Sequence, residues 1–302
     1  MEKVGIWLSA FRLRTLPLAL SSIFMGAAIV SDPPSDFVLT LSLAALTTLF
    51  LQILSNLAND YGDHQNGADN DKRVGPARAV QSGDISSKAM FKAMLIFSVL
   101  ALTSGCALLY NAFDQEQGLL AFIFFIIGLL AIGAALKYTA GKNPYGYRGL
   151  GDISVFVFFG LIGVAGTNFL FTKDFDLIAL LPACTIGFLS AAVLNLNNMR
   201  DINGDRESGK RTIVVLMGSK QAKMYHYALI FSAWMSLLLF FLLSDLNSWA
   251  YLAFIFVPIH LVHLKKVAAV QVPADFDPEL KKIALSTFGI SFILLLLAVI
   301  SL

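Results

Sequence analysis

The stretch VLTLSLAALTTLFLQILSNL, residues 38–57, is followed directly by ANDYGD, residues 58–63. The first part is long and apolar enough to cross a bilayer, which takes about 20 such residues in a helix. The second part brings Asp60 and Asp63 to the end of that run. A carboxylate costs about 2.5–3.5 kcal/mol at the centre of a spanning helix. We therefore predict a membrane-spanning helix that ends in a polar site.

The composition of the whole chain is that of a membrane protein. Of its 302 residues, 57% are hydrophobic and 14% are charged, against about 25% charged residues in a soluble domain. The net charge of +2 is too small to indicate a nucleic-acid partner. We predict an all-α, multi-span helical bundle in the lipid bilayer that forms one transmembrane domain over residues 1–302. Its nine predicted spans cover 14–31, 38–57, 90–111, 118–137, 153–171, 177–197, 226–243, 248–264 and 284–301.

Basic residues divide unequally between the two sets of loops. All of the 22 Lys and Arg residues except Lys173 fall in alternate connections, starting with the N-terminal segment. Cytoplasmic loops of membrane proteins collect Lys and Arg. The pattern therefore supports nine spans and predicts that the N-terminus and the loops with the acidic residues are cytoplasmic. The C-terminus is then expected on the opposite side.

Two loops on this predicted cytoplasmic side share one design. Each sets an asparagine and two aspartates on one helix face, because the residues are spaced by three or four. These residues are Asn56, Asp60 and Asp63 after the second span, and Asn198, Asp201 and Asp205 after the sixth. The loops lie four spans apart, so a bundle of two similar halves would bring them face to face.

Two facing carboxylate clusters favour a cation between them. Ligands that are all oxygen favour Mg²⁺ or Ca²⁺ over zinc, and Mg²⁺ often shares its coordination shell with phosphate. A diphosphate is therefore the natural ligand, with nearby cations to neutralise its remaining charge. The candidates for that role are Lys72, Arg73, Arg78, Lys210 and Arg211. The alternative is that these acids are ordinary polar residues at helix ends, paired with the cations that follow.

The motifs resemble those of a known family. Asn59-Asp60-x-x-Asp63 and Asp201-x-x-x-Asp205 resemble the two aspartate-rich motifs of the UbiA-type intramembrane prenyltransferases. Four segments resemble, in particular, the branch of that family that acts on 1,4-dihydroxy-2-naphthoate in menaquinone biosynthesis: RLRTLP at 12–17, NDYGDHQNGAD at 59–69, YTAGKNPYGYRGLGD at 138–152 and NNMRDINGDRESGKRT at 197–212. One position departs from the general family pattern, because Gly67 stands where a further acid is usual and the next acid is Asp69.

The resemblance implies a fold, a reaction and a metal. It implies a nine-helix bundle in a bacterial cytoplasmic membrane, in which Mg²⁺ holds a polyprenyl diphosphate. The allylic C–O bond ionises, and the ring of 1,4-dihydroxy-2-naphthoate attacks at the carbon that bears the carboxylate, with loss of CO₂. The metal ligands implied are Asp60, Asp63, Asp69, Asp201 and Asp205, and the substrate contacts include Asn56, Asn59 and Asn198.

The segment 138–152 is expected to help bind the acceptor. Its glycines and proline exclude a regular helix, and irregular backbone at membrane depth is tolerated only against protein or a wet cavity. We expect Lys137, Tyr138 and Arg148 to act on the acceptor, with Tyr145 and Asp152 orienting it. Arg14 is expected to meet the acceptor carboxylate or the diphosphate. The alternative is an interfacial belt of tyrosines with topology-setting charges.

Two further functions stay open at this point. One is a sister prenyltransferase acting on 4-hydroxybenzoate, homogentisate or haem, because acceptor choice depends on the shape of the pocket. The other is a cation-coupled secondary transporter, since intramembrane acids and a two-half design are also typical of transporters. Position separates the two classes: transporter acids lie near the bilayer midplane, whereas these are predicted at the ends of spans.

Overall fold

The computed structural model describes residues 2–67, 75, 78–244 and 248–300, and this part of the chain is helical, without strands. A helix satisfies its own backbone hydrogen bonds, and it must do so in a membrane because hydrocarbon offers no hydrogen-bonding groups. The α-helices are α1 (Glu2–Phe11), α2 (Leu16–Ala28), α3 (Phe37–Gln65), α4 (Ser87–Ala112), α5 (Gly118–Lys137), α6 (Gly151–Val155), α7 (Thr167–Thr172), α8 (Leu180–Glu207), α9 (Ile213–Met217), α10 (Ser219–Leu243), α11 (Val257–Ala269) and α12 (Phe276–Ile300). Shorter 3₁₀ segments are η1 (Leu13–Thr15), η2 (Gln115–Gln117), η3 (Tyr145–Arg148), η5 (Ser248–Phe256) and η6 (Pro273–Asp275), and the π-helix η4 (Phe156–Gly166) joins α6 to α7.

The predicted fold class, a multi-span helical membrane bundle, is confirmed. Eight helices in the described residues are long and apolar enough to cross a membrane. The first predicted span differs, because α2 has only 13 residues. Arg12 has a left-handed backbone with φ 50°, and the 3₁₀ turn η1 then separates α1 from α2. Pro17 lies in the first turn of α2, where its missing N–H costs nothing.

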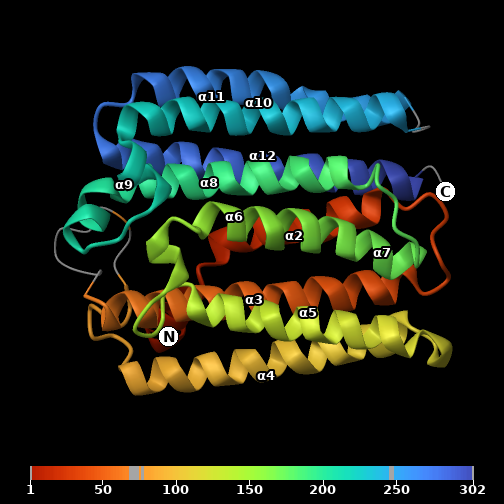
Figure 1. The fold of residues 1–302 in the computed structure, drawn as a ribbon, viewed down its shortest axis with the longest axis horizontal. Helices are drawn as coiled ribbons and strands as arrows, with labels where there is room; N and C mark the ends of the chain where they lie inside the picture. The colour runs from red at the N-terminus through yellow and green to blue at the C-terminus, as the bar shows by residue number, and fades with distance from the viewer. Residues whose placement is uncertain (1, 68–74, 76–77, 245–247, 301–302) are drawn as a thin grey trace.

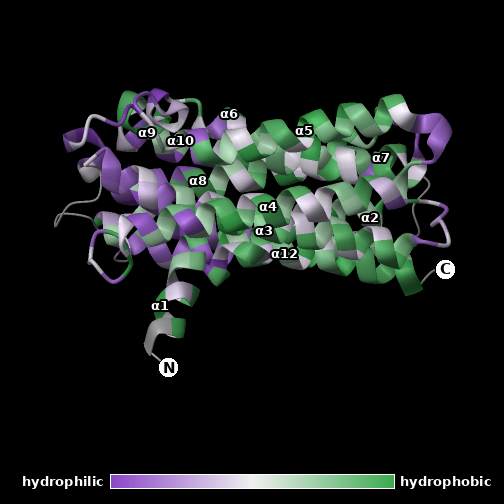
Figure 2. Cartoon of the chain, turned by 90° about the horizontal axis from the view of Figure 1, so that it is seen from below, coloured by the Kyte–Doolittle hydropathy of each residue, from purple (hydrophilic) through white to green (hydrophobic). Residues whose placement is uncertain are grey.

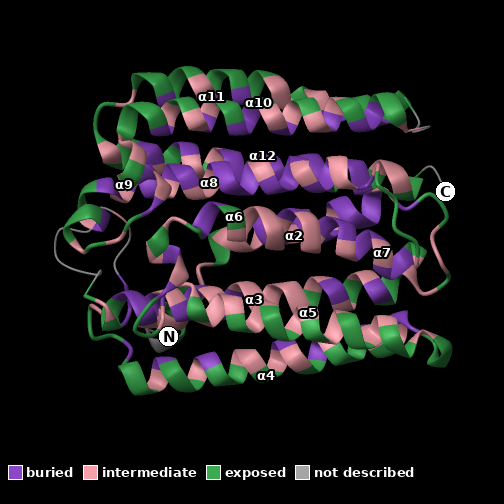
Figure 3. Cartoon of the chain, in the orientation of Figure 1, coloured by how far each residue is buried: buried purple, intermediate pink, exposed green. Residues whose placement is uncertain are grey.

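The long helices lie side by side in two groups with a central layer between them (Figure 1). One group is α3, α4 and α5, and the other is α8, α10, α11 and α12. The helices α2, α6 and α7 lie between the groups, where α2 contacts both α3 and α12. Helix α8 is the most buried span and packs against α10, α12 and η4 (Figure 3).

One end of the bundle is distinctly polar. The loops that follow α3, α5, α8 and α11 all lie at the same end (Figure 1), which we call the polar end. Hydrophilic residues gather mainly there, and the middle of the bundle is apolar (Figure 2). The described chain begins near the polar end, and α12 finishes at the opposite end (Figures 1 and 2). Both acidic motifs therefore occupy the same end of the molecule.

Candidate active site

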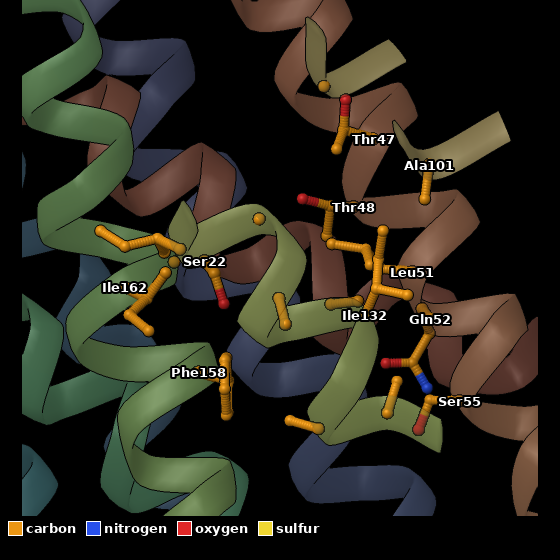
Figure 4. Close-up of a pocket in the computed structure, with 18 of the residues that line it drawn as sticks. Ser22, Thr47, Thr48, Leu51, Gln52, Ser55, Ala101, Ile132, Phe158 and Ile162 are labelled. Carbon is orange, nitrogen blue, oxygen red and sulfur yellow. The ribbon is translucent and has the colours of Figure 1, made fainter. Parts of the chain in front are cut away.

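An apolar cavity of about 380 Å³ lies between the group of α3, α4 and α5 and the central layer of helices. Residues of α2, α3, α4, α5 and η4 line it, and most of its wall is apolar. Figure 4 shows Phe158 and Ile162 of η4 on one side of the cavity and Leu51 of α3 on the other. A volume of this size is in the range of small-molecule sites, about 300–1,000 Å³.

A strip of polar residues on α3 leads along this cavity toward the acidic motif. Thr48, Gln52, Ser55 and Asn59 follow one another at spacings of three or four, so they share a helix face. Figure 4 shows the first three of them at the cavity. Because Asp63 lies one turn beyond Asn59, the strip connects the apolar interior to the polar end.

The predicted contact residue Asn56 also lines the cavity but is engaged in structure. Its amide nitrogen donates to the Phe11 carbonyl oxygen and to the Thr15 hydroxyl, both at 2.9 Å. Gln52 donates to its amide oxygen at 3.3 Å. Asn56 therefore fixes the turn around Arg12 to α3. This turn brings the predicted substrate residue Arg14 to the polar end, where its side chain is exposed.

The two aspartates of the first motif are buried, at 2% exposure for Asp60 and 3% for Asp63. Asp60 accepts hydrogen bonds from the backbone N–H groups of Ala79 (3.1 Å) and Val80 (3.3 Å). It thereby fixes the loop between α3 and α4. That loop carries Arg78, which lies 3.3 Å from a carboxylate oxygen of Asp63.

Asp63 joins the two groups of helices. The ammonium of Lys210, from the segment after α8, lies 2.9 Å from Asp63 Oδ1 and 3.7 Å from Asp205 Oδ1. The hydroxyl of Tyr147 donates to the same Asp63 oxygen at 2.7 Å, and its ring lies 4.7 Å below the Lys210 ammonium. The predicted approach of the two motifs is therefore present, with a lysine between them.

Asp201 has different partners. Arg200, the preceding residue, binds both of its oxygens at 3.0 and 2.8 Å. The same guanidinium reaches Asp277 at the start of α12 at 2.6 Å, and Arg14 lies 3.7 Å from Asp277. Asn198, one turn earlier on α8, is buried. The second motif is thus linked to α12 and to the N-terminal turn.

The segment 138–152 is clamped onto α3. A Cβ at Gly62 would lie 2.5 Å from the carbonyl carbon of Thr139, so only glycine allows the two backbones this close. Thr139 donates to the Ala58 carbonyl oxygen at 3.0 Å, and Asn66 donates to the Thr139 carbonyl oxygen at 2.8 Å. The irregular segment therefore lies directly against the first motif.

The candidate residues of this segment divide between two places. Tyr138 and Tyr145 line the apolar cavity, with their rings in edge contact at 5.3 Å. Arg148 is exposed and lines a separate pocket at the polar end, which also contains the predicted substrate residue Arg211. Lys137, the last residue of α5, is exposed and belongs to neither wall.

Burial changes the acidity of the two cavity tyrosines. Burial raises the pKa of Tyr138 above its ordinary value, and the negative charge of Asp152 adds to this. Burial also raises the pKa of Tyr145, although a hydrogen bond with Ser154 opposes the shift. Both hydroxyls are therefore protonated near neutral pH. Asp152 itself is buried, and its Oδ1 has no hydrogen-bond partner in the described residues.

Some predicted site residues lie outside the described part of the chain, and some residues of the site were not predicted. Asp69, Lys72 and Arg73 lie outside the described residues. In the part of the chain that is described, no group of three acidic, histidine or cysteine side chains is arranged to hold a metal. There Asp63 contacts Arg78 and Lys210, and Asp201 contacts Arg200. Sequence reasoning missed Tyr147, Arg200 and Asp277. Tyr147 and Arg200 lie inside the quoted segments 138–152 and 197–212, and this was the available signal for them.

The fold and site are those of a helical membrane enzyme with acidic motifs at the polar end of an apolar cavity. The chain belongs to the UbiA prenyltransferase family, whose sequence profile matches residues 19–275. It is 41% identical to a 1,4-dihydroxy-2-naphthoate octaprenyltransferase of Haemophilus influenzae, over 97% of this chain and 95% of that protein. It is 42% identical to the octaprenyltransferase of the same name from Escherichia coli, over 93% of this chain and 91% of that protein.

Solved structures share the fold at much lower identity. A UbiA homologue from Aeropyrum pernix matches with a TM-score of 0.70 and 17% identity, over 96% of this chain and 98% of that one. A UbiA homologue from Archaeoglobus fulgidus, solved with DMAPP and Mg²⁺, matches with a TM-score of 0.65 and 16% identity, over 94% and 98% of the two chains. These likenesses support the helical arrangement described above.

Proposed function

We propose that this protein transfers a polyprenyl group from polyprenyl diphosphate to 1,4-dihydroxy-2-naphthoate, in the synthesis of menaquinone. The observation that carries the proposal is the meeting of both aspartate motifs around Lys210, beside an apolar cavity. Relatives with this activity in their names are 41–42% identical over nearly the whole chain. In the reaction the allylic C–O bond breaks, a C–C bond forms at the ring carbon bearing the carboxylate, and CO₂ and diphosphate leave.

The diphosphate site lies at the two aspartate motifs. Asp60, Asp63, Asp201 and Asp205 offer the carboxylate oxygens that Mg²⁺ prefers. The Lys210 ammonium between Asp63 and Asp205 is consistent with a place that attracts positive charge. Bound Mg²⁺ would neutralise charge on the departing diphosphate. Arg78 and Lys210 lie close enough to add fixed positive charge at the same place.

The prenyl tail occupies the apolar cavity. Its wall of α3, α5 and η4 residues excludes water from the allylic carbon, which carries positive charge once the C–O bond breaks. The faces of Tyr138 and Tyr145 stabilise such a charge, because aromatic faces attract cations. The same location explains why the enzyme lies in the membrane, where its lipid substrate is dissolved.

The acceptor ring enters between the tyrosines and the first motif. The polar strip of Gln52, Ser55 and Asn59 supplies hydrogen-bonding groups there. Arg148 lies further out at the polar end, where it meets the incoming carboxylate. We place the polar end on the cytoplasmic side, because the basic loops gather there.

The transporter alternative is not favoured by the position of the acids. Asp60 and Asp63 lie in the last two turns of α3, and Asp205 lies in the last turn of α8. A coupled transporter is expected to hold such residues near the bilayer midplane. A sister prenyltransferase with another aromatic acceptor is the alternative that the experiment below separates.

The test is a transfer assay on the purified protein in detergent. It combines a polyprenyl diphosphate, Mg²⁺ and, in separate reactions, 1,4-dihydroxy-2-naphthoate, 4-hydroxybenzoate and homogentisate, with products identified by mass spectrometry. We expect product only from the naphthoate, release of labelled CO₂ from its carboxyl group, and complete loss of activity with a chelator that excess Mg²⁺ reverses. Prenylated 4-hydroxybenzoate as the main product would assign the chain to a sister activity.

A further inference from the structure

We propose that Lys210 is a built-in counter-ion that keeps divalent cations out of the site until a diphosphate arrives. This inference rests on the proposed function, because it assumes that the two motifs hold a metal-bound diphosphate. Its consequence is that the metal and the diphosphate bind together, rather than the metal binding first.

The position of the lysine carries the argument. Its ammonium lies between one carboxylate from each motif, at 2.9 Å from Asp63 and 3.7 Å from Asp205. All three side chains are largely shielded from water, with exposures of 12% for Lys210, 5% for Asp63 and 11% for Asp205. The ring of Tyr147 covers the ammonium at 4.7 Å, which adds a cation–π contact.

A metal ion and the ammonium exclude each other at this place. Mg²⁺ binds oxygen at about 2.0–2.1 Å, so a metal on the same Asp63 oxygen would lie within a few ångströms of the Lys210 nitrogen. Coulomb repulsion between charges this close is large where water is scarce. A metal that bridges Asp63 and Asp205 must therefore displace the lysine side chain.

The surrounding backbone lets the side chain move while its base stays fixed. The Lys210 backbone N–H donates to the Asp205 carbonyl oxygen at 2.8 Å. Gly209, the preceding residue, makes a tight turn with φ 77°. The flexible four-carbon stem of Lys210 can then turn from the carboxylates to diphosphate oxygens, which form strong charge-assisted hydrogen bonds with an ammonium.

A direct test measures metal binding without any substrate. Mn²⁺ is titrated into the full-length protein in nanodiscs of uncharged lipid, and free Mn²⁺ is followed by electron paramagnetic resonance. We expect Lys210→Met to bind Mn²⁺ about ten-fold more tightly than the wild type, within the usual range for coupled sites. Lys210→Arg keeps the charge and should not tighten binding. Lys220→Met, an exposed lysine at the same end, should behave as the wild type.

Stability supplies a second readout. Without metal, Lys210→Met should melt at a lower temperature than Lys220→Met, because Asp63 and Asp205 lose a shared partner. Mn²⁺ should raise its melting temperature more than that of the wild type. If Lys210→Met does not fold, Lys210→Gln gives the same comparison with a neutral side chain that keeps an N–H donor.

Two outcomes separate the failure of this inference from the failure of the proposed function. If the folded neutral variant binds Mn²⁺ no more tightly than the wild type, the lysine does not exclude metal and the inference is wrong, even when the wild type transfers prenyl groups normally. If the neutral variant gains Mn²⁺ affinity but the wild type transfers no prenyl group to any aromatic acceptor, the counter-ion role stands and the proposed function is wrong.

Discussion

The two aspartate motifs are alike in sequence but differ in their contacts. Asp63 on α3 binds donors from three other segments, namely Arg78, Tyr147 and Lys210. Asp201 on α8 is bound by its own neighbour Arg200, which also reaches Asp277 on α12. The first carboxylate therefore joins the segments of the site, whereas the second is neutralised locally. Similar motifs can thus contribute unequally to one reaction.

This contrast predicts the largest effect for the α3 motif. Asp63→Asn should lower prenyl-transfer kcat by about 10²–10³-fold, the usual loss when a group that stabilises transition-state charge is removed. Asp201→Asn should cost about ten-fold less, because its donor Arg200 is its own neighbour, whereas Asp63 positions donors from three other segments. Initial rates at saturating substrate measure both, with Asp84→Asn as an exposed control in the α3–α4 loop. Equal losses in the two variants would show that the motifs act equivalently.

The α8 side should matter more for folding. Arg200 is 3% exposed and binds Asp201, Asp277 and Asn197. Arg200→Gln should lower the free energy of unfolding by about 1.5–3 kcal/mol, typical for hydrogen bonds to charged groups. Arg78→Gln is the matched variant on the α3 side and should cost less, since its contact with Asp63 is longer, at 3.3 Å.

Thermal unfolding in one detergent measures both arginine variants. If Arg78→Gln melts at a lower temperature than Arg200→Gln, then the α3 side carries the stability as well, and the division of roles between the motifs is wrong.

A smaller effect is expected from the hydroxyl that supports Asp63. Tyr147→Phe removes the 2.7 Å hydrogen bond but keeps the ring beneath Lys210. We expect kcat to fall about ten-fold, as for the loss of one hydrogen bond to a charged group. Asp277→Asn is the counterpart on the α8 side. Its side chain is 42% exposed, so solvent should limit the loss to about two-fold. Steady-state kinetics with both substrates varied would distinguish these values. A larger loss of kcat from Asp277→Asn than from Tyr147→Phe would contradict this prediction.

The sequence predicted the elements of this site better than their contacts. Apolar runs located the long spans because hydrophobic length decides membrane insertion, and residue spacing placed Asp60 with Asp63 on one helix face. The first span was predicted as 14–31, but the helix begins at Leu16 and is short. Pro17 was the available signal, because proline favours the first turn of a helix.

The through-space contacts had no such signal. That Lys210 lies between Asp63 and Asp205 depends on how α3 and α8 are brought together by the helices between them. The pairing of Arg200 with Asp277 depends in the same way on the packing of α8 against α12. Periodicity reports which residues share a helix face, but not which face of another helix lies opposite.

A mild effect is expected for Tyr138, on the cavity side of the segment clamped to α3. Burial raises its pKa above the ordinary value of 10, so the phenol stays protonated across the working range and cannot act as a base. Tyr138→Phe should therefore leave the shape of the pH–rate profile between pH 6 and 9 unchanged and lower kcat only a few-fold, about 1 kcal/mol for one lost hydrogen-bonding group. The raised pKa also makes stability depend on pH, because the folded protein holds the Tyr138 proton more tightly than the unfolded chain does. The stabilising contribution of the protonated phenol is present below the unfolded pKa and is lost as the pH rises above about 10. Loss of an alkaline limb from the profile of Tyr138→Phe would contradict this prediction, because it would show that this hydroxyl does titrate during turnover.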